Sequence, residues 1–197
     1  MKIGLIAPLQ HPISEPFQGG LETHTHLLAR ELQERGHEVI IFGHPESDDR
    51  FRISPFVMPM EIGLGQKAHA YFKLMMAVRK WDFDVVHNNS IHFVPPVRAH
   101  TLACPMITTL HTPPYRSFKL TSRFTRNTPN HKYVAISDFI SRQWAPLVGE
   151  SQVVHNGLDM ADWPFSATAE PNTAVWYGRI APEKGAEYAI QAARMAG

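Results

Sequence analysis

The chain has 197 residues, of which 44% are hydrophobic and 19% are charged. This composition is typical of a folded domain and excludes an intrinsically disordered chain, while the length suits one ordinary domain and not two. The formal net charge of +1 gives no overall field that would attract nucleic acid, so no nucleic-acid partner is expected and any bound anion must be recognised locally.

The cysteine, the histidines and the N-terminal sequence bear on disulfides, metal sites and membrane segments. Cys104 is the single cysteine, and His24 and His26 lie two residues apart on a predicted helix, where they point to different sides. We therefore expect no disulfide, no metal site and no cofactor. The first apolar run stops at Pro8, too early for a signal peptide, and no run reaches the roughly 20 residues of a membrane span. These features predict a cytoplasmic protein with at most peripheral contact with the inner face of a membrane.

The first predicted unit is a strand, a glycine turn, a helix and a second strand, over residues 2–7, 19–20, 20–35 and 38–42. Leucines at helical spacing form an apolar stripe along the helix, and Gly36 ends it. This order is typical of a βαβ unit with parallel strands.

The remaining elements continue the alternation. Helices are predicted at residues 66–81 and 137–147, a broken helical segment at 90–104, and strands at 84–87, 106–110, 132–136 and 152–154. Several of these strands are apolar without alternation, as parallel strands covered on both faces usually are. We therefore predict an α/β fold with a Rossmann-like doubly wound parallel sheet.

A loop-like stretch follows this domain. Residues 161–172 contain Pro164 and Pro171 and read as a linker, after which a strand at 173–177 and a helix at 183–196 are predicted. One strand and one helix cannot bury their apolar faces without neighbours. Either they pack on the first domain, or the chain has been cut. We predict a first domain at 1–160 and, at 173–197, the first strand and helix of a second domain that is incomplete in this chain, so that the sheet is the N-terminal half of a two-domain architecture.

Polar residues and glycines gather where the predicted strands end. They are the Gly19–Gly20 loop, Gly43–His44, His87–Asn88–Asn89, His111–Thr112, Ser137, His155–Asn156–Gly157 and Gly178–Arg179. The carboxyl ends of parallel strands form one edge of an open α/β sheet, and ligands bind at that edge. The sequence therefore predicts a polar, phosphate-binding site there.

Two segments at helix starts are suited to bind an anion. Gly19 and Gly20 have no Cβ, so the backbone N–H groups of the helix start could approach a phosphate closely. Arg179 and Lys184 could converge on a diphosphate. The alternatives are a flexible turn and an ordinary helix start with solvated cations. The dinucleotide motif G-x-G-x-x-G is absent, which disfavours a nicotinamide-dependent dehydrogenase.

Two histidines follow predicted strands. His111 ends an apolar strand and precedes Thr112–Pro113–Pro114, which indicates a fixed loop at the ligand edge. His87 ends the neighbouring predicted strand and is either a wall of the cleft or a structural histidine. His111 is therefore the stronger candidate for a functional role.

Residues 115–132 mix cations with apolar side chains. The cations are Arg116, Lys119, Arg123, Arg126 and Lys132, interleaved with Tyr115, Phe118, Leu120 and Phe124. On a helix these side chains could form a basic, partly apolar surface that contacts anionic lipid or a phosphorylated acceptor. A solvated helix face is the alternative.

Six motifs lie in order along nearly the whole chain. They are Gly19-Gly20-Leu21-Glu22, Asp84-Val85-Val86-His87, Thr109-Leu110-His111-Thr112, Ala135-Ile136-Ser137, Val154-His155-Asn156-Gly157-Leu158-Asp159, and Gly178-Arg179 through Glu183-Lys184-Gly185. Together they resemble the group 1 retaining glycosyltransferases of the family 4 type, which have the two-domain GT-B fold.

The resemblance implies that a sugar is transferred with retention of configuration from a UDP, GDP or ADP sugar, without a metal. The acceptor it implies is unidentified, with a lipid-linked acceptor or a sugar phosphate as candidates. It further implies that Arg179 and Lys184 bind the donor diphosphate beside Gly19 and Gly20, and that His111 is the catalytic residue facing the transferred sugar. The other cleft-lining positions that it implies are Glu22, His87, Ser137, Asn156 and Gly157.

The family's paired glutamates, which contact the donor sugar and ribose, have no counterpart before Gly197. These 197 residues alone are therefore expected to show little or no activity. Two other functions fit the same residues: a non-catalytic module that binds a nucleotide or sugar phosphate, and a GT-B epimerase or phosphorylase. A gene that continues into a second α/β domain with a glutamate pair would favour the transferase over the binding module.

Overall fold

The computed structural model describes residues 1–58, 61, 63–122, 124–168 and 170–196. It divides into two units, Met1–Gly157 and Leu158–Gly197, and each is described by itself. The first unit contains a seven-stranded parallel sheet with the strand order β3-β2-β1-β4-β5-β6-β7. This is a Rossmann-like α/β fold, as predicted.

The strands match the apolar runs of the sequence closely. They are β1 Lys2–Ile6, β2 Glu38–Gly43, β3 Arg52–Pro55, β4 Val85–Asn88, β5 Met106–Leu110, β6 His131–Ala135 and β7 Gln152–Val153. β1 is central, with Ile3 in register with Val39 of β2 on one side and Val85 of β4 on the other. From β1 the chain first adds β2 and β3 on one side of the sheet, and then adds β4 to β7 on the other side.

Helices connect the strands, and α1, α2 and α5 begin and end within three residues of the predicted positions, whereas no bounds were predicted for α4. They are α1 Gly20–Glu34, α2 Leu64–Val78, α3 Val94–Arg98, α4 Arg116–Ser122 and α5 Asp138–Val148, with a 3-10 turn at Ala99–Thr101. The broken segment predicted at 90–104 is the short α3 followed by this turn. Pro95 and Pro96 lie in the first turn of α3, where proline needs no backbone partner for its missing N–H.

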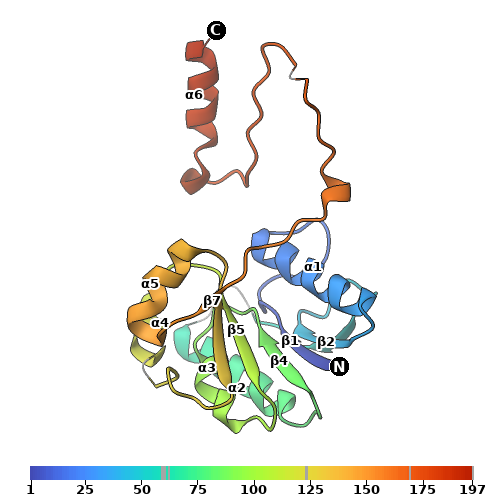
Figure 1. Ribbon diagram of the computed structural model, residues 1–197, viewed down its shortest axis with the longest axis vertical. Coiled ribbons are helices and arrows are strands. Elements are labelled where there is room, and N and C mark those ends of the chain that lie inside the picture. The colour runs from blue at the N-terminus through green and yellow to red at the C-terminus, as the bar shows by residue number, and fades with distance from the viewer. Residues whose placement is uncertain (59–60, 62, 123, 169, 197) are drawn as a thin grey trace. The chain divides into compact units, whose positions relative to one another are not determined.

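Side chains of β1 and β2 alternate between two hydrophobic clusters. Leu5 and Ile41 pack on the α1 side, while Ile6 and Phe42 pack on the α2 side. A third hydrophobic cluster contains Trp144 of α5. Phe93 packs against both this cluster and the cluster on the α2 side. In Figure 1, β4, β5 and β7 face the viewer and α2 and α3 lie behind them. Ile107 of β5 and Val134 of β6 are only half-buried, whereas Ile6 of β1 and Ile41 of β2 are fully buried.

One strand was not predicted. β3 pairs with β2 at the edge of the sheet, and Ile53 is its only strongly apolar residue. Because an edge strand with one buried face needs little apolar sequence, the apolar runs gave no signal for it.

One predicted strand is wrong. Residues 173–177 form no strand, and Val175 and Tyr177 are exposed. A strand requires a neighbour that accepts and donates backbone hydrogen bonds, and no described segment supplies one here. The second unit instead contains 3-10 turns at Met160–Asp162 and Pro182–Lys184 and the helix α6 at Ala186–Ala196, which has no buried residue and starts three residues later than predicted.

Candidate functional site at the carboxyl edge of the sheet

The strand order places a topological switch point at the carboxyl edge between β1 and β4. The chain leaves β1 toward α1, on the β2 side, and leaves β4 toward β5, on the other side. At such a switch point the loops diverge and leave room for a ligand. The Gly19–Gly20 turn, Asn89 and His111 all follow strands that end at this edge.

The N-terminus of α1 carries two glycines. Gly19 caps the helix in an extended conformation that any residue could adopt, and its carbonyl accepts hydrogen bonds from the N–H and Oγ1 of Thr23. A Cβ at Gly19 would lie 3.3 Å from a carboxylate oxygen of Glu22, whereas a Cβ at Gly20 would meet nothing within 4 Å. The fold itself therefore does not require glycine at position 20.

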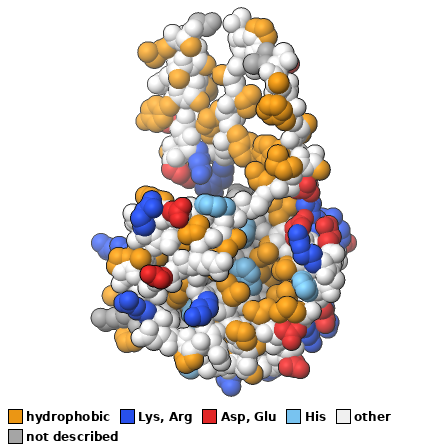
Figure 2. All heavy atoms as spheres, in the orientation of Figure 1, with side chains coloured by type: hydrophobic (Ala, Val, Ile, Leu, Met, Phe, Trp, Pro, Cys, Tyr) orange, Lys and Arg blue, Asp and Glu red, His pale blue; other side chains and the backbone are white. Residues whose placement is uncertain are grey.

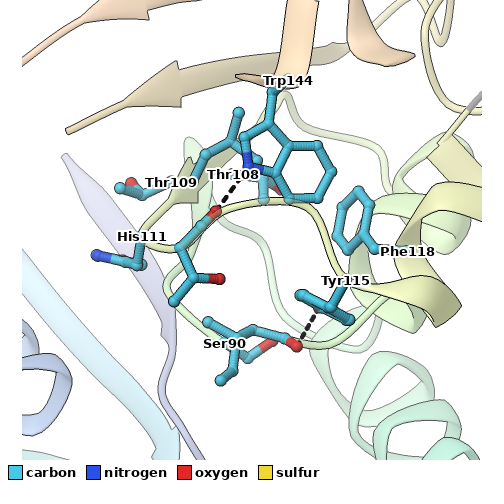
Figure 3. Close-up of a pocket in the computed structure, with 10 residues that line it drawn as sticks. Ser90, Thr108, Thr109, His111, Tyr115, Phe118 and Trp144 are labelled. Carbon is cyan, nitrogen blue, oxygen red and sulfur yellow. Dashed lines mark hydrogen bonds between the residues drawn. The ribbon is translucent and has the colours of Figure 1, made fainter. Parts of the chain in front are cut away.

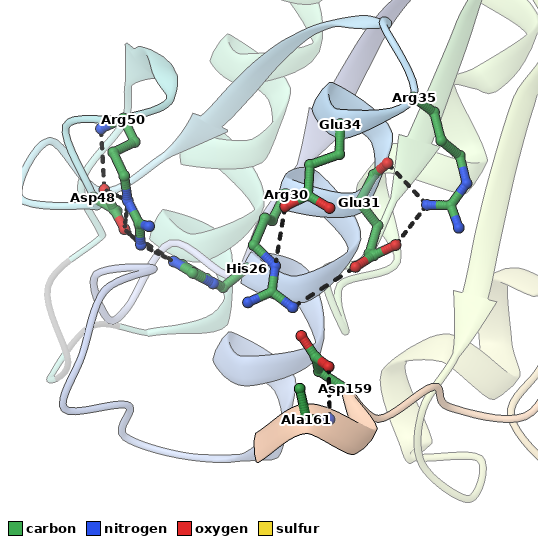
Figure 4. Close-up of polar contacts among 9 residues, drawn as sticks. All are labelled: His26, Arg30, Glu31, Glu34, Arg35, Asp48, Arg50, Asp159 and Ala161. Atoms are coloured by element: carbon green, nitrogen blue, oxygen red, sulfur yellow. Dashed lines mark hydrogen bonds and ion pairs between the residues drawn. The ribbon is translucent and has the colours of Figure 1, made fainter.

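The segment that leads into Gly19 is tied to the rest of the first unit. Ile13 donates its N–H to Ser47 Oγ at 2.9 Å, and the Phe17 ring contacts the edge of the His26 ring. His26 Nε2 in turn lies 2.9 Å from Asp48 Oδ2 (Figure 4). These contacts hold the turn in place from the α1 side.

Asp48 is the charged centre of this anchor. Arg50 binds both carboxylate oxygens, and this contact, together with His26, holds the pKa of Asp48 well below its usual range (Figure 4). The Asp48 carboxylate therefore stays ionised at neutral pH.

Three histidines meet on the α1 side of the sheet. The rings of His24 and His111 make an edge contact with their centroids 4.9 Å apart. His87 Nε2 lies 2.7 Å from Thr109 Oγ1, and His111 Nε2 lies 3.2 Å from Asn89 Oδ1. His87 of β4 and Thr109 of β5 share a face because strand side chains alternate with a period of two. Asn89 and His111, each the first residue after its strand, continue this spacing.

Burial keeps these imidazoles neutral. It lowers the pKa of His111 to about 3, with smaller contributions from His24 and His87, and it lowers the pKa of His87 to about 4. The pKa of His24 is also lowered by burial. At neutral pH the cluster can therefore offer hydrogen bonds and apolar ring faces to a ligand, but not a cation. Within the described ranges, no three His, Cys, Asp or Glu side chains are arranged to hold a metal ion.

The loop that carries His111 is fixed from the other side. Trp144 Nε1 donates to the carbonyl of Thr112 at 2.7 Å, and the Tyr115 hydroxyl donates to the carbonyl of Ile91 (Figure 3). Phe118 and Trp144 line a cavity of only about 10 Å³ beneath this loop, close to the room that a single water needs. In Figure 3 the His111 side chain extends away from these aromatic rings. The cavity thus belongs to the packing of the loop, and the imidazole faces elsewhere.

The remaining predicted positions of the first unit lie further along the same edge. Ser137 caps α5, since its Oγ accepts from the N–H of Ile140 at 3.3 Å. Asn156 and Gly157 are exposed beyond β7. Glu22 is buried in the first turn of α1. The structure therefore brings Gly19, Gly20, Glu22, His87 and His111 to the β1–β4–β5 part of the edge, while Ser137, Asn156 and Gly157 follow β6 and β7.

Arg179 and Lys184 belong to the second unit. Arg179 forms an ion pair with Glu183 at 3.1 Å, and its side chain is 63% exposed. Lys184 lies in the 3-10 turn before α6 and is exposed, and Gly185 follows it in the left-handed region at φ 65°. Lys184 thus precedes a helix, as predicted, whereas Arg179 lies in a loop and not at the end of a strand, because residues 173–177 form none.

Sequence patterns did not single out two residues of the cluster. Asn89 follows β4 and is fully buried, but as one of several polar residues at strand ends it had no distinguishing mark. His24 was considered only as a metal ligand. Its contact with His111 depends on how α1 packs on the sheet, which no local pattern reveals.

Part of the basic segment at 115–132 is exposed. Leu120 and Phe124 are 69% and 72% exposed, and Arg116, Lys119 and Arg126 are exposed beside them in the sequence. Arg123 lies outside the described residues. Lys and Arg side chains are scattered over the α4 and α5 side of the first unit, and histidines reach the surface among hydrophobic side chains (Figure 2). None of the helices in the described ranges is long and apolar enough to cross a membrane.

Comparison with known proteins adds family information to this geometry. Residues 18–162 match glycosyltransferase family 4. The chain is 25% identical to a glycogen synthase of Mycobacterium tuberculosis over 222 aligned residues, which cover 88% of this chain and 54% of that protein. It is 26% identical to a phosphatidyl-myo-inositol mannosyltransferase of Mycolicibacterium smegmatis, with 94% of this chain and 53% of that protein covered.

Solved structures of glycosyltransferases share the fold. The structure of Anabaena HepE in complex with UDP and glucose superposes with a TM-score of 0.59 at 16% identity, covering 85% of this chain and 47% of HepE. AviGT4, a glycosyltransferase involved in avilamycin A biosynthesis, superposes with a TM-score of 0.57 at 22% identity, covering 95% and 51%. These neighbours have the GT-B fold. The chain spans about half the length of the relatives that it matches.

Proposed function

The chain belongs to glycosyltransferase family 4, and we propose that it serves the transfer of a sugar from a nucleotide-diphospho-sugar to an acceptor with retention of configuration. The observation that carries this proposal is the arrangement at the carboxyl edge, where His24 of α1 contacts His111. The proposed ligand crevice lies between the N-terminus of α1 and the His24–His87–His111 cluster. A helix N-terminus suits a phosphate, and neutral imidazoles suit sugar hydroxyls. The UDP and glucose in the HepE complex are ligands of the proposed kind.

Each group has a distinct role in the proposal. Arg179 and Lys184 bind the donor diphosphate and stabilise the negative charge that develops on the departing nucleotide. Gly19 and Gly20 allow the backbone at the start of α1 to approach the phosphates. His111 contacts the transferred sugar. Glu22 and His87 line the crevice, and Ser137, Asn156 and Gly157 extend it along the sheet edge.

The 197-residue chain alone is expected to transfer sugar slowly or not at all. Electrostatic stabilisation of a leaving group is effective in a preorganised site that excludes water. Arg179 and Lys184 are exposed, and α6 beside them buries none of its residues. Two exposed cations would hold a diphosphate weakly, so binding without turnover is the expected behaviour of this segment in isolation.

The test is a transfer assay with the protein encoded by the whole gene. UDP, GDP and ADP sugars are supplied in turn, release of the nucleoside diphosphate is followed with and without candidate acceptors, and the anomeric configuration of the product is read by NMR. The proposal predicts acceptor-dependent release with one nucleotide and a product with the donor's configuration. An inverted product would refute retention, and binding of a nucleotide sugar without any turnover would favour a binding module.

We further propose that the acceptor is lipid-linked and that the segment 115–132 contacts the membrane surface. Exposed Leu120 and Phe124 beside Arg116 and Lys119 combine the apolar and cationic groups that anionic lipid attracts. A related protein carries the name phosphatidyl-myo-inositol mannosyltransferase, which agrees with a lipid acceptor.

Vesicle sedimentation tests this second proposal. Replacing Arg116, Lys119 and Arg126 by Gln should weaken binding to vesicles that contain phosphatidylglycerol by about tenfold or more, since each cation near an anionic surface contributes about 1 kcal/mol. The matched control removes the same charge from the exposed Lys73, Arg79 and Lys80 on and after α2. Equal binding by the wild type and the 116/119/126 variant would contradict the proposal.

A further inference from the structure

Asn89 is held rigidly beside the imidazole of His111. It is fully buried directly after β4, and its backbone N–H donates to the carbonyl of Ile6 in β1 at 2.9 Å. Its side-chain Oδ1 lies 3.2 Å from His111 Nε2. Because the backbone of Asn89 is bonded to the central strand, its amide cannot follow the ring if the loop of His111 moves.

This contact determines where the proton of His111 resides. An amide oxygen only accepts hydrogen bonds, so the ring atom that faces it must carry the proton. In a neutral imidazole the other nitrogen, Nδ1, then has a free lone pair. Within the described residues no hydrogen bond to Nδ1 is present, and this atom is not among the fully buried polar atoms that lack a partner.

The nitrogen of the Asn89 side-chain amide, Nδ2, also indicates that this residue serves to orient His111. Its Nδ2 is buried and has no hydrogen-bond partner among the described residues. Leaving a buried amide N–H unpaired costs about 1–3 kcal/mol, which a leucine of similar size would avoid. An asparagine at this position is therefore unfavourable for the fold taken alone, and orienting His111 is the role that its one hydrogen bond can perform.

We propose that Asn89 is a positioning residue that holds His111 as the Nε2–H tautomer, so that Nδ1 accepts a hydrogen bond from a hydroxyl group of the donor sugar. The identity of the ligand rests on the proposed function, whereas the tautomer does not. The low pKa of His111 agrees with this role, because a protonated ring would have no lone pair to offer.

The decisive measurement is the tautomer of His111 in the 197-residue chain. Two-bond 1H–15N correlation spectra at pH 7 distinguish a protonated ring nitrogen from an unprotonated one, and a His111→Gln variant assigns the signals. We expect Nε2 to be protonated and Nδ1 to be unprotonated. Protonation at Nδ1 would overturn the inference, even if the whole protein transfers sugar. The expected tautomer in a protein without transferase activity would refute only the proposed function.

Variants of Asn89 test the positioning role. Asn89→Leu should leave a mixture of both tautomers, and Asn89→Asp should raise the pKa of His111 by about one to three pH units, because a carboxylate favours the charged ring. Thr109→Val is the matched control, since it removes the partner of His87 and leaves the Asn89 contact intact. An unchanged tautomer in a folded Asn89→Leu and an unchanged pKa in Asn89→Asp would both contradict the role.

A kinetic readout separates positioning from mere structural support. In the active whole protein, Asn89→Asp should move the acidic limb of the kcat profile toward higher pH by the same amount as the pKa of His111. A general loss of activity at every pH, without such a displacement, would mean that Asn89 only supports the fold. If Asn89→Leu fails to fold, the spectrum of the unmodified chain and the Asn89→Asp titration still decide the question.

Discussion

Gly20 shows at the level of single residues how structural and functional demands differ. A Cβ at this position would enter open space, and its backbone angles are not in the left-handed region. Gly36, by contrast, has a φ of +79° at the end of α1, where a side chain is strained. The fold therefore leaves room for a side chain at position 20, and the proposed phosphate at the start of α1 is what would require glycine there.

Gly20→Ala should separate the two demands. We expect the free energy of unfolding to stay the same or to rise by up to about 1 kcal/mol, because alanine favours the helix. The value of kcat/KM for transfer should fall about 10- to 100-fold, because the added methyl group would remove one backbone hydrogen bond to a charged phosphate. Denaturant melts and donor titrations measure both quantities.

Gly36→Ala is the control for that experiment. It should lower the free energy of unfolding by about 1 kcal/mol and leave kcat/KM unchanged. If Gly20→Ala behaved like Gly36→Ala, glycine at position 20 would serve the fold and not the ligand.

At the level of elements, α5 stabilises the loop that carries His111. Trp144 is fully buried against Phe118 and donates its indole N–H to Thr112, the residue after His111. Prediction from sequence placed a helix at 137–147 and a fixed loop at His111, but gave no link between them. The residues concerned are 32 positions apart, and only the packing of α5 beside the loop joins them.

Trp144→Phe should loosen this loop selectively. The variant keeps an aromatic ring but leaves the Thr112 carbonyl without its partner, so we expect unfolding to become easier by about 1–2 kcal/mol. Amide hydrogen exchange at residues 111–115 should accelerate more than in the rest of the sheet. Ile140→Val, which trims the same helix without touching the loop, should lower stability without this local effect. Uniform acceleration in both variants would show that the indole N–H is not the element that fixes the loop.

For the whole molecule, buried histidines couple stability to pH. Burial lowers the pKa of His92 and of His131 to about 4, from about 6.5 in an unfolded chain. The unfolded state thus binds more protons below pH 6.5, so the stabilisation is fully present above that pH and is lost as the pH falls toward 4. His87 and His111 act in the same direction.

We therefore expect the free energy of unfolding to fall between pH 7 and pH 4, by on the order of 1–3 kcal/mol for each fully buried histidine. Urea melts of the 197-residue chain at several pH values measure this slope. His131→Gln, which cannot titrate, should make the slope shallower, whereas replacing the exposed His100 by Gln should leave it unchanged. A flat dependence in the wild type would mean that these rings are solvated.

Local patterns were sufficient for most of the fold. Apolar runs, helical spacing and the glycines at turns predicted six of the strands, the helices between them and the edge at which polar residues gather, since each pattern lies within a few residues along the chain. Prediction from local patterns failed at β3, where Ile53 alone was too weak a signal, and at residues 173–177, where strand-forming residues have no partner to pair with among the described residues.

Contacts between distant segments determine the arrangement of the candidate site. That His24 touches His111, and that Asn89 faces its ring, follows from how α1 packs and from the adjacency of β4 and β5, because the segments involved are separated by 22 to 87 positions in sequence and meet only when the sheet has formed.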